Sequence, residues 1–142
     1  MQRLSVVALF CEDVREEKSG GETLIGIYPD NVNVPSIPCA FPKLALYVRI
    51  NLNVEFDHPS LSLTLTMPDK TQVAVTQFER SLIDKALADA RATGNPIAGL
   101  IGRVVSGNFP VPIPGRIVAT VKVGDESIVA GSLNVQQTPK PA

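Results

Sequence analysis

One stretch of the sequence, residues 43–55, restricts the fold more than any other. Six apolar side chains occur there at every second position: Leu44, Leu46, Val48, Ile50, Leu52 and Val54. Because successive side chains of a β-strand point to opposite faces of the sheet, this period of two predicts a strand with one face in a core and the other in water. Residues 61–67 repeat the pattern with Leu61, Leu63, Leu65 and Met67.

Other segments of strand length share this chemistry. Continuous or alternating apolar runs occupy residues 4–11, 22–28, 72–76, 100–105, 116–123 and 127–135. Gly20-Gly21 and Gly124-Asp125 predict hairpins, and Pro68-Asp69-Lys70 predicts a tight reversal that makes residues 43–76 a three-stranded meander. Val, Ile and Thr, which favour strands, make up about a quarter of the 142 residues. The fold class is therefore mainly β, a two-sheet antiparallel β-sandwich of about 7–8 strands.

One segment has a helical period instead. Between residues 77 and 93, apolar side chains recur every three to four positions, at Phe78, Leu82, Ile83, Ala86, Leu87 and Ala90. The preceding Thr76-Gln77-Phe78-Glu79 fits a capping box, and Gly94 and Pro96 end the pattern. We therefore expect one α-helix, at about residues 77–93, inserted between strands of the sandwich.

The 12 prolines mark the boundaries of these elements. Two groups of three prolines interrupt the strand patterns. They are Pro35, Pro38 and Pro42, and Pro110, Pro112 and Pro114. Proline has no N–H to donate to a neighbouring strand, so it is disfavoured in the interior of a sheet. These stretches are expected to run extended, at a sheet edge or as crossovers. We interpret residues 1–135 as a single domain and the polar residues 136–142 as a frayed C-terminal tail.

Charge and cysteine content narrow the function. The formal net charge is −1, so no basic surface for a nucleic-acid backbone is expected. No apolar run reaches the ~18 residues of a membrane span, and the short run before Cys11 ends in the bulky Phe10, which disfavours a secretion signal. Cys11 and Cys39 are interpreted as thiols of a cytoplasmic protein, because two cysteines are too few for a disulfide framework.

Patterns that carry catalysis or bind metal are sparse. His58, the single histidine, lies in the polar sequence Phe56-Asp57-His58-Pro59, which favours a solvated loop. The enzymatic alternative that remains is a Cys–His nucleophilic pair of His58 with Cys11 or Cys39. One histidine and two distant cysteines lack the ligand spacing of a zinc site, and no cofactor is expected.

The densest charge cluster follows the first strand. Its carboxylates, Glu12, Asp13, Glu16 and Glu17, supply the oxygen ligands that calcium prefers. Arg15 and Lys18 compete for the same carboxylates, and the pattern of a calcium loop is missing. A solvated charged loop is therefore the expectation.

Residues 10–30 resemble the opening of a family of small bacterial proteins of unknown function. In that family a first strand ends in Cys-acid-Asp-Val/Ile-Arg, as residues 11–15 do here, and a second strand is close to Thr-Leu-Ile-Gly-Ile-Tyr, the sequence of residues 23–28. Pro42-Lys43-Leu44 leading into Tyr47-Val48-Arg49 is similar to the family's next strand. The resemblance implies one β-sandwich-like domain and no assigned activity.

The candidate binding residues are Glu12, Asp13, Arg15 and Tyr28. They lie where a buried strand leaves the core, so Asp13 can accept hydrogen bonds from the following turn and Arg15 can reach Asp13 or Tyr28. The same residues fit either a structural corner or a recognition surface.

The lack of a convergent catalytic set favours a non-enzymatic module that binds a protein partner or self-associates. A small-ligand or carbohydrate-binding module is the alternative, although a chain without Trp offers a poor stacking surface for sugars. A Cys/His hydrolase is the third hypothesis.

Overall fold

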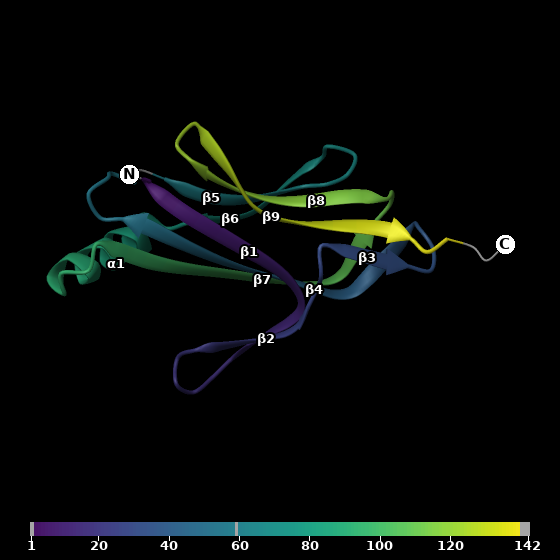
Figure 1. Cartoon of the computed structure of the whole chain (residues 1–142), viewed down its shortest axis with the longest axis horizontal. Helices are drawn as coiled ribbons and strands as arrows, with labels where there is room; N and C mark the ends of the chain where they lie inside the picture. Colours follow the sequence, from purple (N-terminus) through teal and green to yellow (C-terminus); the bar gives the residue numbers. More distant parts are fainter. Residues whose placement is uncertain (1, 59, 140–142) are drawn as a thin grey trace.

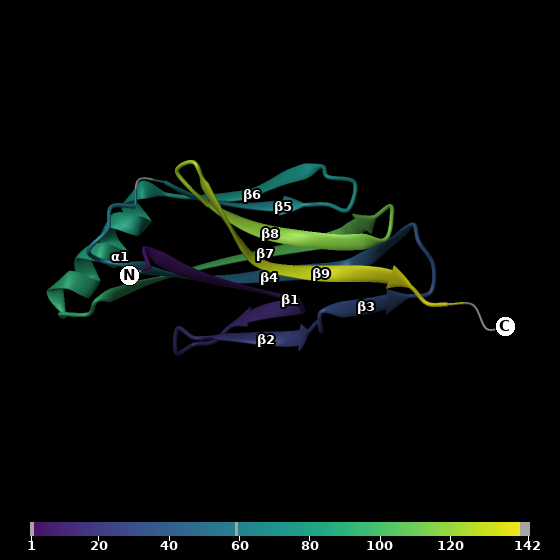
Figure 2. The same cartoon turned by 45° about the horizontal axis from the view of Figure 1, so that its top comes forward.

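Alternating apolar strands assemble into two β-sheets that pack face to face, with one helix at the end of the sandwich (Figure 1, Figure 2). The computed structural model describes residues 2–58 and 60–139. The four-stranded sheet has the order β2-β1-β4-β7, with β1 Leu4–Glu16, β2 Glu22–Ile27, β4 Cys39–Asn53 and β7 Ile97–Val111. The five-stranded sheet has the order β3-β9-β8-β5-β6, with β3 Asn31–Val34, β9 Glu126–Gln137, β8 Gly115–Val123, β5 Leu61–Thr66 and β6 Gln72–Phe78. The helix α1, Arg80–Ala92, connects β6 to β7.

The predicted mainly β sandwich with a single helix is confirmed. The strand count is higher than the expected 7–8, because nine strands occur among the described residues. The additional strand is β3, whose four residues fall in the stretch of turn and proline signals. The sequence predicted antiparallel sheets, but β3 pairs with β9 in parallel, so one of the two sheets is mixed.

The core lies between the two sheets, and its side chains come from the inward positions of each alternating strand. Val48, Ile50 and Leu52 of β4 are completely buried, while Arg49 between them is exposed. Ile117, Ala119, Val121 and Val123 of β8 repeat this arrangement from the opposite sheet. The period of two therefore places one side of each strand in the core, as the sequence predicts.

Strand neighbours differ from the predicted meander. β4 pairs with β1 and β7, whereas β5 and β6 belong to the other sheet. The predicted chain of neighbours from residue 43 to residue 76 is therefore wrong between β4 and β5. An alternating pattern states which face of a strand is buried but not which strand lies beside it. The hairpins β1–β2 and β8–β9 are both confirmed.

The helix begins later than predicted. Residues 77 and 78 belong to β6, and the helix starts after Glu79, which makes no side-chain capping hydrogen bond. The predicted capping box is therefore wrong, because pairing with β5 holds Gln77 and Phe78 in a strand. The buried helix face consists of Ile83, Leu87 and Ala90, whereas Leu82, also expected inside, is 52% exposed.

The C-terminal boundary also differs. β9 continues through Gln137, because Gln136 and Gln137 pair with Asn33 and Val34 of β3, so the tail predicted from residue 136 begins at least two residues later. Its last residues, 140–142, lie outside the described residues, as does Pro59. None of the helical structure in the described parts of the chain combines the length and the apolar character that a membrane-spanning helix requires.

Candidate functional site

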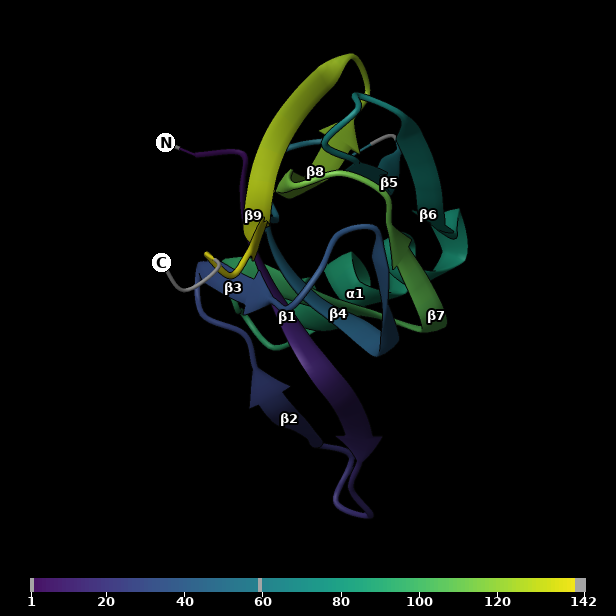
Figure 3. The same ribbon diagram turned by 90° about the vertical axis from the view of Figure 1, so that its right-hand side faces the viewer.

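The β1–β2 hairpin projects from the sandwich and carries the predicted binding residues (Figure 3). Leu4–Cys11 of β1 pair with β4, and Cys11–Glu16 pair with β2, so that Cys11 has a partner on both sides. At its base is an open hollow of about 370 Å³, lined by Glu12, Asp13, Ile25, Tyr28, Pro42 and Lys43. Three of the four candidate residues, Glu12, Asp13 and Tyr28, therefore come together. Arg15 does not line the hollow.

Asp13 and Lys43 join the hairpin to β4. The ammonium group of Lys43 lies 2.9 Å from Oδ2 of Asp13, and the N–H of Val14 donates a hydrogen bond to Oδ1. The hydrogen bond from Lys43, followed by the one from Val14, lowers the pKa of the Asp13 carboxyl. The sequence predicted hydrogen bonds to Asp13 from the following turn. The donors are instead Val14, in the same strand, and Lys43, for which the sequence gave no sign.

Tyr28 forms the wall of the hollow next to the core. Its ring packs against Phe41 at a centroid distance of 5.7 Å, and its N–H donates to the carbonyl oxygen of Phe10. Burial, together with the nearby charge of Glu12, raises the pKa of the Tyr28 phenol. The phenol therefore stays protonated at neutral pH and can donate a hydrogen bond.

Glu12 lies across Gly26 of the neighbouring strand. Gly26 has a φ of +64°, and a Cβ atom added there would lie 2.6 Å from Oε2 of Glu12. The left-handed backbone conformation favours glycine, which accounts for the glycine in the sequence of residues 23–28, and the missing side chain leaves room for the Glu12 carboxylate. Among the residues that the structure describes, the Glu12 carboxylate has no ion-pair partner.

Arg15 instead contacts another residue of the hairpin. Its Nε lies 2.8 Å from Oε1 of Glu17, and the hydroxyl of Thr23 donates a hydrogen bond to the same oxygen. The hydrogen bonds from Thr23 and Arg15 lower the pKa of the Glu17 carboxyl. The prediction that Arg15 reaches Asp13 or Tyr28 finds no support in these contacts.

Arg103 of β7 binds the far end of the hairpin. Its guanidinium forms ion pairs with Glu16 and Glu22, which face each other across the two strands. The predicted charged loop is therefore an extended strand up to Glu16, and Asp13, Glu16 and Glu17 each have a basic partner. In the described part of the chain, no three His, Cys, Asp or Glu side chains are arranged to hold a metal ion.

The sequence offered no signal for the role of Arg103. It is a single basic residue within an alternating strand, and nothing local distinguishes it from any other outward-facing arginine. Only the folding of the hairpin brings Glu16 and Glu22 to it, across 87 and 81 residues of sequence.

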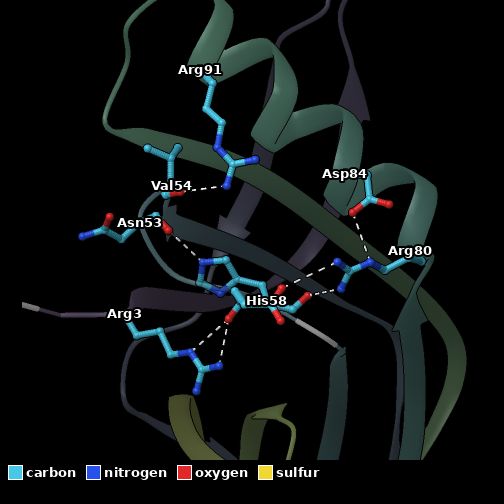
Figure 4. Close-up of polar contacts among 8 residues, drawn as sticks. Arg3, Asn53, Val54, His58, Arg80, Asp84 and Arg91 are labelled. Carbon is cyan, nitrogen blue, oxygen red and sulfur yellow. Dashed lines mark hydrogen bonds and ion pairs between the residues drawn. The ribbon is translucent and has the colours of Figure 1, made fainter.

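His58 is buried, contrary to the predicted solvated loop. Its side chain has no exposed surface, its Nε2 lies 2.9 Å from the carbonyl oxygen of Asn53, and its Nδ1 has no hydrogen-bond partner. Figure 4 shows three arginines donating to the backbone of this loop: Arg3 to Asp57, Arg80 to His58 and Arg91 to Val54. The carbonyl groups of a loop packed against protein need such donors, which lets His58 lie inside.

The arrangement also separates His58 from both thiols. Cys39 begins β4, whereas His58 binds the carbonyl of Asn53, where β4 ends, so about 46 Å of strand lies between them. Cys11 pairs with Ala45, which is about 26 Å along the same strand from Asn53. Burial also raises the pKa of the Cys11 thiol. Neither cysteine can form the nucleophilic pair with His58 that the sequence left open.

Comparison with known proteins gives one match. The model of a family of unknown function, DUF6941, matches residues 6–136, from the first strand to the last. No curated protein and no solved structure matches the chain.

Proposed function

The chain belongs to this family of unknown function, DUF6941, and we propose that it is a non-enzymatic protein-interaction module whose contact surface is the β1–β2 hairpin with the hollow at its base. One observation carries the proposal: two large apolar side chains of β2 are exposed, Ile25 to 40% in the lining of the hollow and Ile27 to 53% two residues along the strand. Exposed apolar groups next to polar ones are typical of the surfaces that bind other proteins.

The position of β2 adds backbone groups to this surface. β2 is an edge strand of the four-stranded sheet, and β1 is the one described strand that pairs with it. Unpaired N–H and C=O groups at such an edge can bind an extended segment of another protein or of a second copy of the chain.

The charges of the hollow favour a basic side chain on the partner. Asp13 is neutralised by Lys43, which leaves Glu12 as the carboxylate without an ion-pair partner among the described residues. A lysine or arginine of the partner would place its aliphatic part against Ile25 and its charge at Glu12.

The cysteines and the net charge support a cytoplasmic protein that does not bind nucleic acids. Both cysteines are free thiols, and the formal net charge of −1 provides no excess of positive charge for phosphate groups. We propose the cytoplasm as its location on these grounds.

The proposal can be tested with two matched variants. Tagged wild-type protein, Ile27→Asp and Val129→Asp are used for capture from cell extract and for size-exclusion chromatography with light scattering. Val129 is the control, because it is 66% exposed on β9 of the other sheet. We expect a co-purifying protein or a dimer with wild-type and Val129→Asp, and a loss of at least tenfold with Ile27→Asp. A strict monomer without a retained partner, or equal retention by both variants, would contradict the proposal.

A second candidate function is the binding of a small polar ligand in the hollow, which offers a phenol, a carboxylate and an ammonium group within about 370 Å³. Thermal unfolding in the presence of sugars, nucleotides and calcium distinguishes the two functions. A melting temperature that none of these compounds changes favours the protein partner.

A further inference from the structure

A second cavity lies between the two sheets, and it shares no residue with the hollow at the hairpin. It has a volume of about 180 Å³ and is lined by Phe10, Leu44, Leu46, Leu65, Val73, Val75, Val104, Ser106 and Phe109. The cavity lies on the side where the sandwich ends in the edge strands β6 and β7, which belong to different sheets (Figure 3).

The lining changes from buried to exposed across the cavity. Phe10, Leu44 and Leu46 form a floor in the core, and each is no more than 4% exposed. At the rim, Val73 of β6 is 45% exposed, and Val104 of β7 is partly exposed. The cavity is therefore open to solvent between the two edge strands.

The chemistry of the lining restricts what can occupy it. Eight of the nine lining residues are apolar, and the polar one is Ser106. A stably bound water needs about two to four polar partners, which this lining does not supply. A charged group placed at the floor would lose its hydration without gaining a partner. The inserted part of an occupant must therefore be hydrocarbon.

The volume indicates the size of that hydrocarbon. An apolar protein cavity of about 150 Å³ holds one benzene molecule, so a cavity of 180 Å³ accepts a group of about six to eight carbons. Ser106 lies on β7 among the partly exposed positions and can form one hydrogen bond with a hydroxyl or carboxyl group. We propose that this cavity binds the tail of a small amphiphile, with its polar head beside Ser106.

The edge of β7 near the opening is poorly suited to pairing with a strand of another protein. Asn108 has a φ of +50°, and Pro110 lacks an N–H group. Irregular backbone and proline are features that prevent an edge strand from pairing regularly. A free small molecule is therefore a better occupant than the inserted side chain of an added strand.

Adjacent residues of β7 provide a test with a matched control. Val104 lines the cavity, whereas Val105 is 44% exposed on the opposite face of the same strand. Val104→Phe fills the cavity, and Val105→Phe adds the same volume outside it. Sodium octanoate and 1-octanol are titrated into wild-type protein and both variants, with amide chemical shifts and the melting temperature as readouts. The two probes distinguish an anionic from a neutral head.

We expect saturable shifts at amides of β6 and β7 and a rise in melting temperature of a few degrees for wild-type and Val105→Phe with at least one probe. Val104→Phe should bind at least tenfold more weakly. If Val104→Phe does not fold, Val75→Phe fills the cavity from the other sheet. The proposal is overturned if neither probe binds the wild-type protein, if the filled variant binds equally well, or if Val104→Phe is simply more stable and the wild-type cavity remains empty.

Discussion

At the scale of single residues, His58 shows how a local sequence can mislead about burial. Its neighbours Asp57 and Ser60 are polar and exposed, and a proline follows it. The side chain is nevertheless buried, because three arginines donate hydrogen bonds to the carbonyl groups around it. Arg3 lies just before β1, and Arg80 and Arg91 lie in α1. Each arginine lies 22 to 54 residues along the chain from the carbonyl group that it binds, so no local sequence pattern could predict these hydrogen bonds.

Replacing His58 by Ala tests this structural role. The variant loses the bond between Nε2 and the carbonyl of Asn53 and leaves a buried void, which should lower the free energy of unfolding by about 2–4 kcal/mol. Urea denaturation followed by circular dichroism measures the loss. Asp57→Ala is the control, because that side chain is 82% exposed and its carbonyl group is retained. Equal midpoints for the two variants would show that His58 is not part of the core.

At the scale of elements, the β1–β2 hairpin depends on contacts from outside itself. Asp13 is joined to Lys43 of β4, and Glu16 and Glu22 are joined to Arg103 of β7. A two-stranded hairpin alone is only marginally stable in water, so these contacts stabilise the position of the β1–β2 hairpin relative to β4 and β7. The proposed contact surface is therefore held in one orientation before any partner binds.

Arg103→Gln should loosen the hairpin without unfolding the sandwich. We expect amide hydrogen exchange of the β1–β2 ladder to become about two- to fivefold faster, while the buried strands β5 and β8 remain protected. Arg49→Gln is the control, since Arg49 is exposed on β4 and its side chain contacts only Asn51 among the hydrogen bonds of the described residues. High salt should weaken the ion pair with Glu16, whose side chain is 66% exposed, more than the ion pair with Glu22, whose side chain is 12% exposed, because salt screens exposed charges most. Unchanged exchange at low salt would exclude a role for Arg103 in holding the hairpin.

In two long strands the buried face also changes where the sequence shows interruptions. In β4 the buried positions pass from the odd-numbered Phe41 to the even-numbered Leu44, and in β7 they pass from Leu100 to Val111. Pro42 and Asn108 lie at these points. These signals mark a switch of the inward-facing positions within continuous strands and not the ends of strands; Pro42 even lies in β4, which has a neighbour on both sides, contrary to the expected edge or crossover.

At the scale of the whole molecule, one contact brings the two sheets unusually close. Gly131 of β9 lies against the backbone of Ala8 in β1, and a Cβ atom added there would be 2.5 Å from the carbonyl oxygen of Ala8. Backbone cannot yield as a flexible side chain does, so β9 can cross β1 only where a residue without a side chain stands.

Gly131→Ala should therefore destabilise the whole sandwich. We expect the free energy of unfolding to fall by about 1–3 kcal/mol, because the two sheets must separate to accept one methyl group. Urea denaturation with both a fluorescent-dye probe and circular dichroism measures the change. Gly21→Ala is the control, since its added Cβ would meet only Ser19 Oγ, at 3.6 Å. If Gly131→Ala is as stable as Gly21→Ala, the close crossing does not limit the packing of the sheets.

The sequence by itself determined the sandwich class, most strand positions, both hairpins and the single helix. Each of these follows from local periodicity or from turn residues, which act over a few positions. It also predicted three residues that line the hollow, Glu12, Asp13 and Tyr28, as candidate binding residues, because they lie close together in the sequence of one hairpin.

Tertiary structure alone decided the rest. This covers which strands pair with β4, the inclusion of Gln77 and Phe78 in β6, the burial of His58, the ion pairs of Arg103 with the hairpin and the apolar cavity between β6 and β7. Each depends on residues that are distant in sequence and adjacent in space. A strand's alternation specifies a buried face, but the partner strand, the donor for a buried carbonyl and the shape of a gap between sheets are properties of the packed molecule.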